Sequence, residues 1–206
     1  MISQKTDEWF EARLGKVTAS RVHAIMGKGK SSEFSKSAET YAVELIAEEM
    51  TGFPTSAYGA ALDWGNHYEP IARDNITKKE GRELLEVGFK YNESYKLGAS
   101  ADGVIMQDLT PIPVEIKCPF NSVNHIRHAL VEGKDLPREY WWQVQTQILI
   151  YDAPYGYFYS FDPRNKANKL ITKRIDRSEV DTNYLIDRVE QFIAYKNTLK
   201  EKINDT

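Results

Sequence analysis

The sequence predicts a single domain of the α/β or α+β class, in which helices flank a mixed central sheet of about five strands. Segments with apolar residues at helical spacing alternate along the chain with short runs of β-branched and aromatic residues. The length of 206 residues is close to the usual size of one domain. We therefore expect one domain over residues 1–206.

Apolar spacing and capping residues predict six helices. The first is short, begins at a Thr6 or Asp7 cap and reaches Leu14. The last begins at a Ser178 cap. Pro70 lies inside the third helical segment, where proline removes a backbone donor and clashes with the preceding turn. It predicts a kink or a restart of that helix. The five longer segments span 38–51, 60–79, 121–133, 138–152 and 178–203.

Five further segments have the composition or the alternation of β-strands. A turn that contains Asp108 separates the second from the third. The segments span 84–91, 103–106, 112–117, 155–161 and 170–175.

The composition excludes several classes of protein. Hydrophobic residues make up 41% of the chain and charged residues 28%, which rules out disorder as a whole. No run of 18 apolar residues is present, so we expect no membrane span. The polar N-terminal stretch does not read as a signal peptide, and the lone Cys118 favours a reducing compartment. These features predict a cytoplasmic protein. Its formal net charge at pH 7 is −3.

The residues with the clearest chemistry are Asp102, Glu115 and Lys117. Glu115 and Lys117 are two apart on a predicted strand, so their side chains project from the same face. If the preceding strand pairs with it as a hairpin, Asp102 lies near Glu115. Two carboxylates suit the binding of Mg²⁺. With an ammonium group beside them, they suit the metal-assisted hydrolysis of a phosphodiester. The alternative is an exposed strand with a weak Glu–Lys pair, beside an ordinary Asp-Gly turn.

Six short motifs from residue 9 to residue 164 give this site a context. They are 9–20 (WFEARLGKVTAS), 64–69 (WGNHYE), 100–103 (SADG), 115–120 (EIKCPF), 143–145 (QVQ) and 162–164 (DPR). With these motifs in this order, the chain resembles the YqaJ-like viral recombinase family of the PD-(D/E)xK nuclease superfamily. The resemblance implies a restriction-endonuclease-like fold and Mg²⁺-dependent digestion of duplex DNA from a 5′ end.

The resemblance also implies a role for each matching residue. Asp102, Glu115, Glu69 and the backbone carbonyl of Ile116 would bind two Mg²⁺ ions, for which Mn²⁺ would substitute. Lys117 would position the attacking water, and Gln145 and, less directly, Gln143 would orient water or phosphate. The implied 5′-phosphate pocket consists of Arg13, Thr18, Ser20 and Ser100. The chain departs from the family pattern at Ala101, where proline is frequent, and at Pro70, directly after Glu69.

The activity implied by the resemblance is a 5′-to-3′ exonuclease that releases 5′-mononucleotides and leaves a 3′ overhang. Such resection feeds single-strand annealing recombination in a phage or prophage system. The implied partners are duplex DNA ends, a single-strand annealing protein and two further copies of the chain in a ring-shaped trimer. Two alternatives stay open: a related nuclease that prefers single strands or flaps, and a non-catalytic DNA-binding scaffold.

Several other features carry simpler interpretations. Residues 27–37 are rich in Gly, Ser and Lys and predict a mobile basic loop, either solvated or touching a DNA backbone. Cys118 is predicted to be a buried structural cysteine. The four histidines form no zinc pattern, so we expect surface or hydrogen-bonded residues. Five aromatic residues are expected in the core rather than stacked on bases. They are Trp141, Trp142, Tyr155, Tyr157 and Tyr159.

Overall fold

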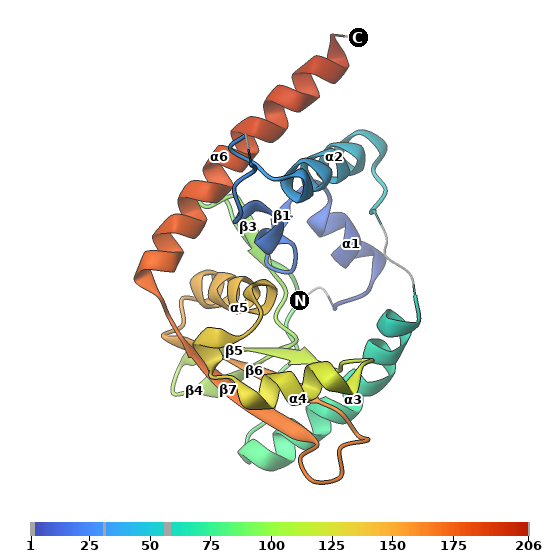
Figure 1. The fold of residues 1–206 in the computed structure, drawn as a ribbon, viewed down its shortest axis with the longest axis vertical. Helices are drawn as coiled ribbons and strands as arrows, with labels where there is room; N and C mark the ends of the chain where they lie inside the picture. The colour runs from blue at the N-terminus through green and yellow to red at the C-terminus, as the bar shows by residue number, and fades with distance from the viewer. Residues whose placement is uncertain (1–2, 31, 56–58, 206) are drawn as a thin grey trace.

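The computed structural model describes residues 3–30, 32–55 and 59–205, and within these ranges the chain forms a mixed α/β fold (Figure 1). The predicted fold class is confirmed. The strands form two separate sheets, of four and three strands, in place of one sheet of about five. In the described part of the chain, no helix combines the length and the apolar composition that a membrane crossing requires.

The four-stranded sheet has the order β4-β5-β6-β7. Its strands span Gly103–Gln107, Thr110–Lys117, Tyr155–Phe161 and Leu170–Asp176. β4 and β5 form an antiparallel hairpin, β5 and β6 are parallel, and β6 and β7 are antiparallel. All four strands lie where the sequence predicts them.

The three-stranded sheet has the order β1-β3-β2, with strands at Val17–Thr18, Leu97–Ala99 and Lys90–Asn92. The prediction of a strand over 84–91 is wrong for most of that segment. Only its last two residues belong to β2, and Leu85 forms an isolated bridge with Val104 of β4. Leu84 is buried but its neighbours on both sides are exposed, so the segment lacks the regular alternation of a strand with one buried face.

Six α-helices lie in the described ranges. They are α1 (Asp7–Arg13), α2 (Lys36–Thr51), α3 (Ala60–Glu80), α4 (Ser122–Leu130), α5 (Arg138–Tyr151) and α6 (Glu179–Asn204), together with the short 3₁₀ helices η1 (Val22–Ile25) and η2 (Gly133–Asp135). The side chains of Thr6 and Ser178 cap α1 and α6 as predicted. α4 ends three residues earlier than expected, before η2.

Pro70 lies inside α3, and the predicted restart of this helix does not occur. α3 is continuous from Ala60 to Glu80. Proline cannot donate to the carbonyl of Asn66, four residues earlier. Because both residues are exposed, water can satisfy that carbonyl, so the helix continues through the proline at a modest cost.

The core centres on α5, which lies between the two sheets (Figure 1) and contacts strands of both. Every residue of this helix from Trp141 to Tyr151 is buried. The aromatic residues predicted in the core are buried, except Tyr157, which is half-buried. α3 packs on the four-stranded sheet, where Ala72 and Ile76 share an apolar cluster with Val114 and Ile116. β5 therefore contacts both α3 and α5.

The segment 27–37 is anchored at its C-terminal end. Residue 31 lies outside the described residues, and α2 begins at Lys36 after a Ser35 cap. The ring of Phe34 is buried in the main core cluster. The buried guanidinium of Arg188 donates to backbone carbonyls before, at the start of and within the segment. The mobility of this loop stays a prediction.

Candidate active site

Four elements that are distant in the sequence converge on one pocket of about 410 Å³. α1 contributes Arg13, α3 contributes Glu69, β5 contributes Glu115 and Lys117, and α5 contributes Gln143. The pocket therefore brings together residues of the 9–20, WGNHYE and EIKCPF motifs and the first glutamine of the QVQ motif.

The hairpin of β4 and β5 brings Asp102 to Glu115. Gly103 pairs with Val114 in the antiparallel register, so the next pair outward is Asp102 and Glu115. The Oδ2 atom of Asp102 accepts a hydrogen bond from the backbone N–H of Ile116 at 2.6 Å. Arg73 of α3 donates to the backbone carbonyl of Asp102. The expected proximity of the two carboxylates is thus a consequence of the hairpin register.

Glu115 is almost fully buried, with 1% of its surface exposed, and both of its carboxylate oxygens have a partner. The Oε1 atom lies 2.5 Å from the Nζ atom of Lys117. The Oε2 atom accepts a hydrogen bond of 2.6 Å from the Nε2 atom of Gln147 on α5. These contacts hold the carboxylate in one orientation at the wall of the pocket.

The charged groups of this cluster shift one another's pKa values. Burial, followed by the negative charge of Glu115, raises the pKa of Asp102 well above its usual value. Burial alone would lower the pKa of Lys117, but the charges of Glu115 and Asp102 outweigh burial and raise it. Lys117 is therefore a permanent cation near pH 7, and the two carboxylates repel each other with only one ammonium between them.

The donor atoms fit a hard divalent cation. Asp102, Glu115 and Ile116 line the pocket, and two carboxylates with a neighbouring backbone carbonyl are groups that could bind such an ion. Glu69 lines the same pocket, where its Oε2 atom pairs with the Nζ atom of Lys5 at 3.0 Å. No three His, Cys, Asp or Glu side chains of the described ranges form a ready-made cluster. Mg²⁺ needs none, because it binds through one or two carboxylates and keeps several waters.

The structure places Gln145 outside this site, which corrects the sequence-based assignment. Its Nε2 atom donates to the carbonyl of Asp176 at 2.8 Å, and its Oε1 atom accepts from the N–H of Ser178 at 3.1 Å. Residues two apart on a helix point about 200° from each other, whereas residues four apart share a face. Gln143 and Gln147 therefore face the site, and Gln145 ties α5 to the start of α6. The helical spacing of Gln143 and Gln147 was the signal for the missed residue.

The residues predicted to bind a 5′-phosphate lie together beside the carboxylates. The Nη1 atom of Arg13 donates to the hydroxyl of Ser100 at 3.3 Å, and its guanidinium stacks 4.0 Å from the centre of the Trp9 ring. Arg13, Ser20 and Ser100 line the main pocket. Thr18 is buried and lines an adjoining pocket of about 210 Å³ that Arg13 and Ser20 also line.

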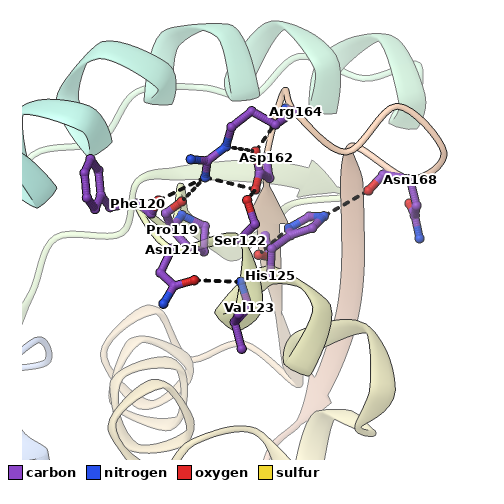
Figure 2. A network of polar contacts seen from close by, with 10 residues as sticks. Pro119, Phe120, Asn121, Ser122, Val123, His125, Asp162, Arg164 and Asn168 are labelled. Carbon is purple, nitrogen blue, oxygen red and sulfur yellow. Dashed lines mark hydrogen bonds and ion pairs between the residues drawn. The ribbon is translucent and has the colours of Figure 1, made fainter.

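A polar network holds the chain that leaves the site after β5 (Figure 2). The buried carboxylate of Asp162 accepts hydrogen bonds from the Arg164 guanidinium at 2.8 and 3.1 Å and from the Ser122 hydroxyl at 2.6 Å. Arg164 also donates to the carbonyls of Pro119 and Phe120. Its guanidinium stacks 4.3 Å from the Trp64 ring of α3. The DPR motif thus connects the end of β6, the segment after Lys117 and the helix that carries Glu69.

The remaining candidates have structural environments. His125 and His128 are buried, and each Nδ1 atom lies about 3.0 Å or less from the Ser160 hydroxyl, as expected for hydrogen-bonded histidines. Cys118 is half-buried rather than buried, because it lines the pocket beside Lys117. Burial raises the pKa of its thiol to about 12, so the thiol stays protonated and is a poor nucleophile near pH 7.

Comparison with known proteins identifies the family. Residues 8–154 match the YqaJ-like viral recombinase domain. The chain belongs to the YqaJ-like viral recombinase family. Its fold is similar to the crystal structure of an alkaline exonuclease (LHK-Exo) from Laribacter hongkongensis, with 32% identity, 97% of each chain covered and a TM-score of 0.82. The same exonuclease in complex with dAMP gives a TM-score of 0.83 at the same identity and coverage.

A more distant structure extends this family comparison. A phage-related exonuclease from Haemophilus somnus 129PT shares the fold, with a TM-score of 0.74, 18% identity and coverage of 91% of this chain and 96% of its own. A search of curated proteins found no match. Membership of the YqaJ-like family and the similarity to the alkaline exonuclease make this chain a nuclease of the phage-exonuclease type, and the restriction-endonuclease-like core is consistent with these structures.

The polar network of Figure 2 predicts a pH-dependent contribution to stability. Burial raises the pKa of Asp162, but hydrogen bonds from Arg164 and Ser122 outweigh it and hold the pKa at about 2. Asp162→Asn should lower the free energy of unfolding at pH 7 by about 2 kcal/mol, because the buried side chain loses charge-assisted hydrogen bonds from Arg164 and Ser122. The difference should shrink as the pH falls from about 4 toward 2, where the native carboxyl is itself protonated.

Urea denaturation at several pH values measures this difference. Asp176→Asn is the matched control, because its exposed carboxylate also pairs with an arginine and should contribute less than about 1 kcal/mol. A loss no larger than that of the control, or a difference that stays constant down to about pH 3, would contradict the assignment.

Proposed function

We propose that the chain is a Mg²⁺-dependent 5′-to-3′ exonuclease that acts on linear double-stranded DNA. It releases 5′-mononucleotides and leaves a 3′ single-stranded overhang. The observation that carries this proposal is the convergence of Asp102, Glu115 and Lys117 in one pocket with Arg13 and Ser100. A metal-binding carboxylate pair beside a phosphate-binding arginine is the set of groups that cleavage next to a terminal phosphate requires.

The carboxylates define where the metal ions belong. Asp102, Glu115 and the carbonyl of Ile116 would hold Mg²⁺, and Glu69 would join them after exchanging its contact with Lys5. We propose two ions, with Mn²⁺ able to replace Mg²⁺. Ions held by these residues would lower the pKa of a water molecule and neutralise charge on the scissile phosphate.

Lys117 and Gln143 act on the reacting groups directly. The Nζ atom of Lys117 lies 2.5 Å from Glu115 at the wall of the pocket, and its ammonium stabilises negative charge on the attacking water and the phosphate. Gln143 lines the pocket with an amide that can donate to a phosphate oxygen or orient the water. The two side chains approach from β5 and α5, on different walls of the same pocket.

The polarity of digestion follows from the phosphate pocket. Arg13 presents a guanidinium that matches phosphate oxygens, and Ser20, Thr18 and Ser100 add neutral donors. A 5′-phosphate bound there would bring the first phosphodiester to the carboxylates. The similar alkaline exonuclease was solved in complex with dAMP, a nucleoside monophosphate, and this supports release of mononucleotides here.

Family membership supports the wider setting of this activity. We propose that the overhang is passed to a single-strand annealing protein, in a phage- or prophage-encoded recombination system in the bacterial cytoplasm. A ring of three copies around the DNA would retain the duplex without base-specific contacts. This arrangement suits a chain with a net charge of −3, whose basic groups need only face the channel.

Digestion of a linear duplex with different labels at its 5′ and 3′ ends tests polarity and metal dependence together. The 5′ label should appear first, as a mononucleotide, and only with Mg²⁺ or Mn²⁺. A duplex with 5′-hydroxyl ends should be digested more slowly, because Arg13 then has no terminal phosphate to bind. Release of the 3′ label first, internal cuts, or digestion in the presence of a chelator would each contradict the proposal.

Removal of the ammonium group tests its role in the chemical step. Lys117→Met keeps an unbranched stem near Tyr140 and should lower kcat by about 100-fold or more, as for loss of one transition-state donor. Duplex binding, measured with Ca²⁺ to prevent cleavage, should change by less than about threefold. Lys166→Met, at an exposed position, is the control. A folded Lys117→Met protein with near-native kcat would exclude Lys117 from the reaction.

A further inference from the structure

The side chain of Gln147 is fully buried on α5, and its Nε2 atom donates to Glu115 at 2.6 Å. Lys117 holds the opposite oxygen of the same carboxylate at 2.5 Å. Glu115 is therefore held between two donors, one from its own strand and one from the helix across the pocket wall. Rotation of the carboxylate would break at least one of these two contacts.

The other end of the Gln147 amide has no such partner. Its Oε1 atom is buried without a hydrogen-bond partner in the described part of the chain. An unpaired buried carbonyl costs about 1–3 kcal/mol. Apolar residues such as Val144 and Ile148 fill the neighbouring positions of α5, so an apolar side chain at 147 would avoid this cost. The amide thus costs stability because its Oε1 atom is unpaired, whereas its Nε2 atom donates a hydrogen bond to Glu115.

We propose that Gln147 is a positioning residue that orients Glu115 for the divalent metal ion. This inference rests on the proposed metal site at Asp102 and Glu115. A ligand that is already fixed loses little freedom when the metal binds, and partners that hydrogen-bond to ligands typically change metal affinity by 10–100-fold. Gln147 acts through Glu115 and contacts neither DNA nor the metal.

Direct binding of Mn²⁺, followed by the electron paramagnetic resonance signal of the free ion, tests this role without DNA. Gln147→Met keeps the length of the side chain but removes the donor. Its Kd for Mn²⁺ should rise by about 10–100-fold. The rate of duplex digestion should be restored largely by raising the metal concentration. Thermal stability should change little, because removal of the unpaired carbonyl offsets loss of the hydrogen bond to Glu115.

Gln145→Met provides a matched control on the same helix. Gln145 is also fully buried, but both ends of its amide are occupied by groups outside the pocket. This variant should lose stability and keep the native Kd for Mn²⁺. Gln147→Asn is a second test that retains an amide but withdraws it from Glu115 by one methylene group, and it should also weaken Mn²⁺ binding.

The outcomes separate this inference from the proposed function. If the native chain binds no Mn²⁺, the metal site itself is refuted and the inference falls with it. If the native chain binds Mn²⁺ and both Gln147 variants bind it equally well, only the positioning role is overturned. A loss of affinity in the Gln145 control as large as that in Gln147→Met would show that Gln147 is merely structural.

Discussion

The crowding of three charged groups at the end of one hairpin, with Glu115 buried and the other two half-buried, is the constraint on which the rest of the structure depends. Asp102, Glu115 and Lys117 lie together because β4 and β5 pair in one register, and a shift by one residue would turn Glu115 to the opposite face. Burying charge is costly unless each group is paired. The backbone N–H of Ile116, the ammonium of Lys117 and the amide of Gln147 provide those partners.

The surrounding elements serve this cluster from both faces of the sheet. α3 covers one face with apolar residues and extends Glu69 toward the pocket, while α5 covers the other and supplies Gln143 and Gln147. The Asp162–Arg164 pair fixes the segment that follows Lys117 and packs on Trp64 of α3. Burial and then the negative charge of Glu115 raise the pKa of Asp102, so the two carboxylates repel each other in this cluster. A bound cation would relieve this repulsion.

The sequence allows the hairpin of β4 and β5 to be predicted because strand periodicity is simple. The spacing of Glu115 and Lys117 assigns both to one face, and the pairing of the two strands then brings Asp102 to them. The order of the motifs identifies the family because it fixes residue types along the chain. It does not fix the rotation of a helix about its axis, so it cannot say which side chains of that helix face the site. The motif therefore predicts Gln145 at the site, whereas Gln147 occupies that face of α5.

Two errors in the predicted secondary structure also have physical causes. The alternation over 84–91 is partial, and the bridge of Leu85 with Val104 depends on a partner that the segment itself does not reveal. Pro70 indicates a helix break by its chemistry, but an exposed position lets α3 continue. Each of these depends on packing between distant segments, which the sequence does not encode at short range.

The central claim is that β5 and the residue before β4 form a divalent metal centre. Diffraction from crystals grown with Mn²⁺, collected where manganese scatters anomalously, tests it most directly. The account predicts anomalous density within coordination distance of Asp102, Glu115 and the carbonyl of Ile116. Density only at other positions, or none at this pocket at saturating Mn²⁺, would contradict it.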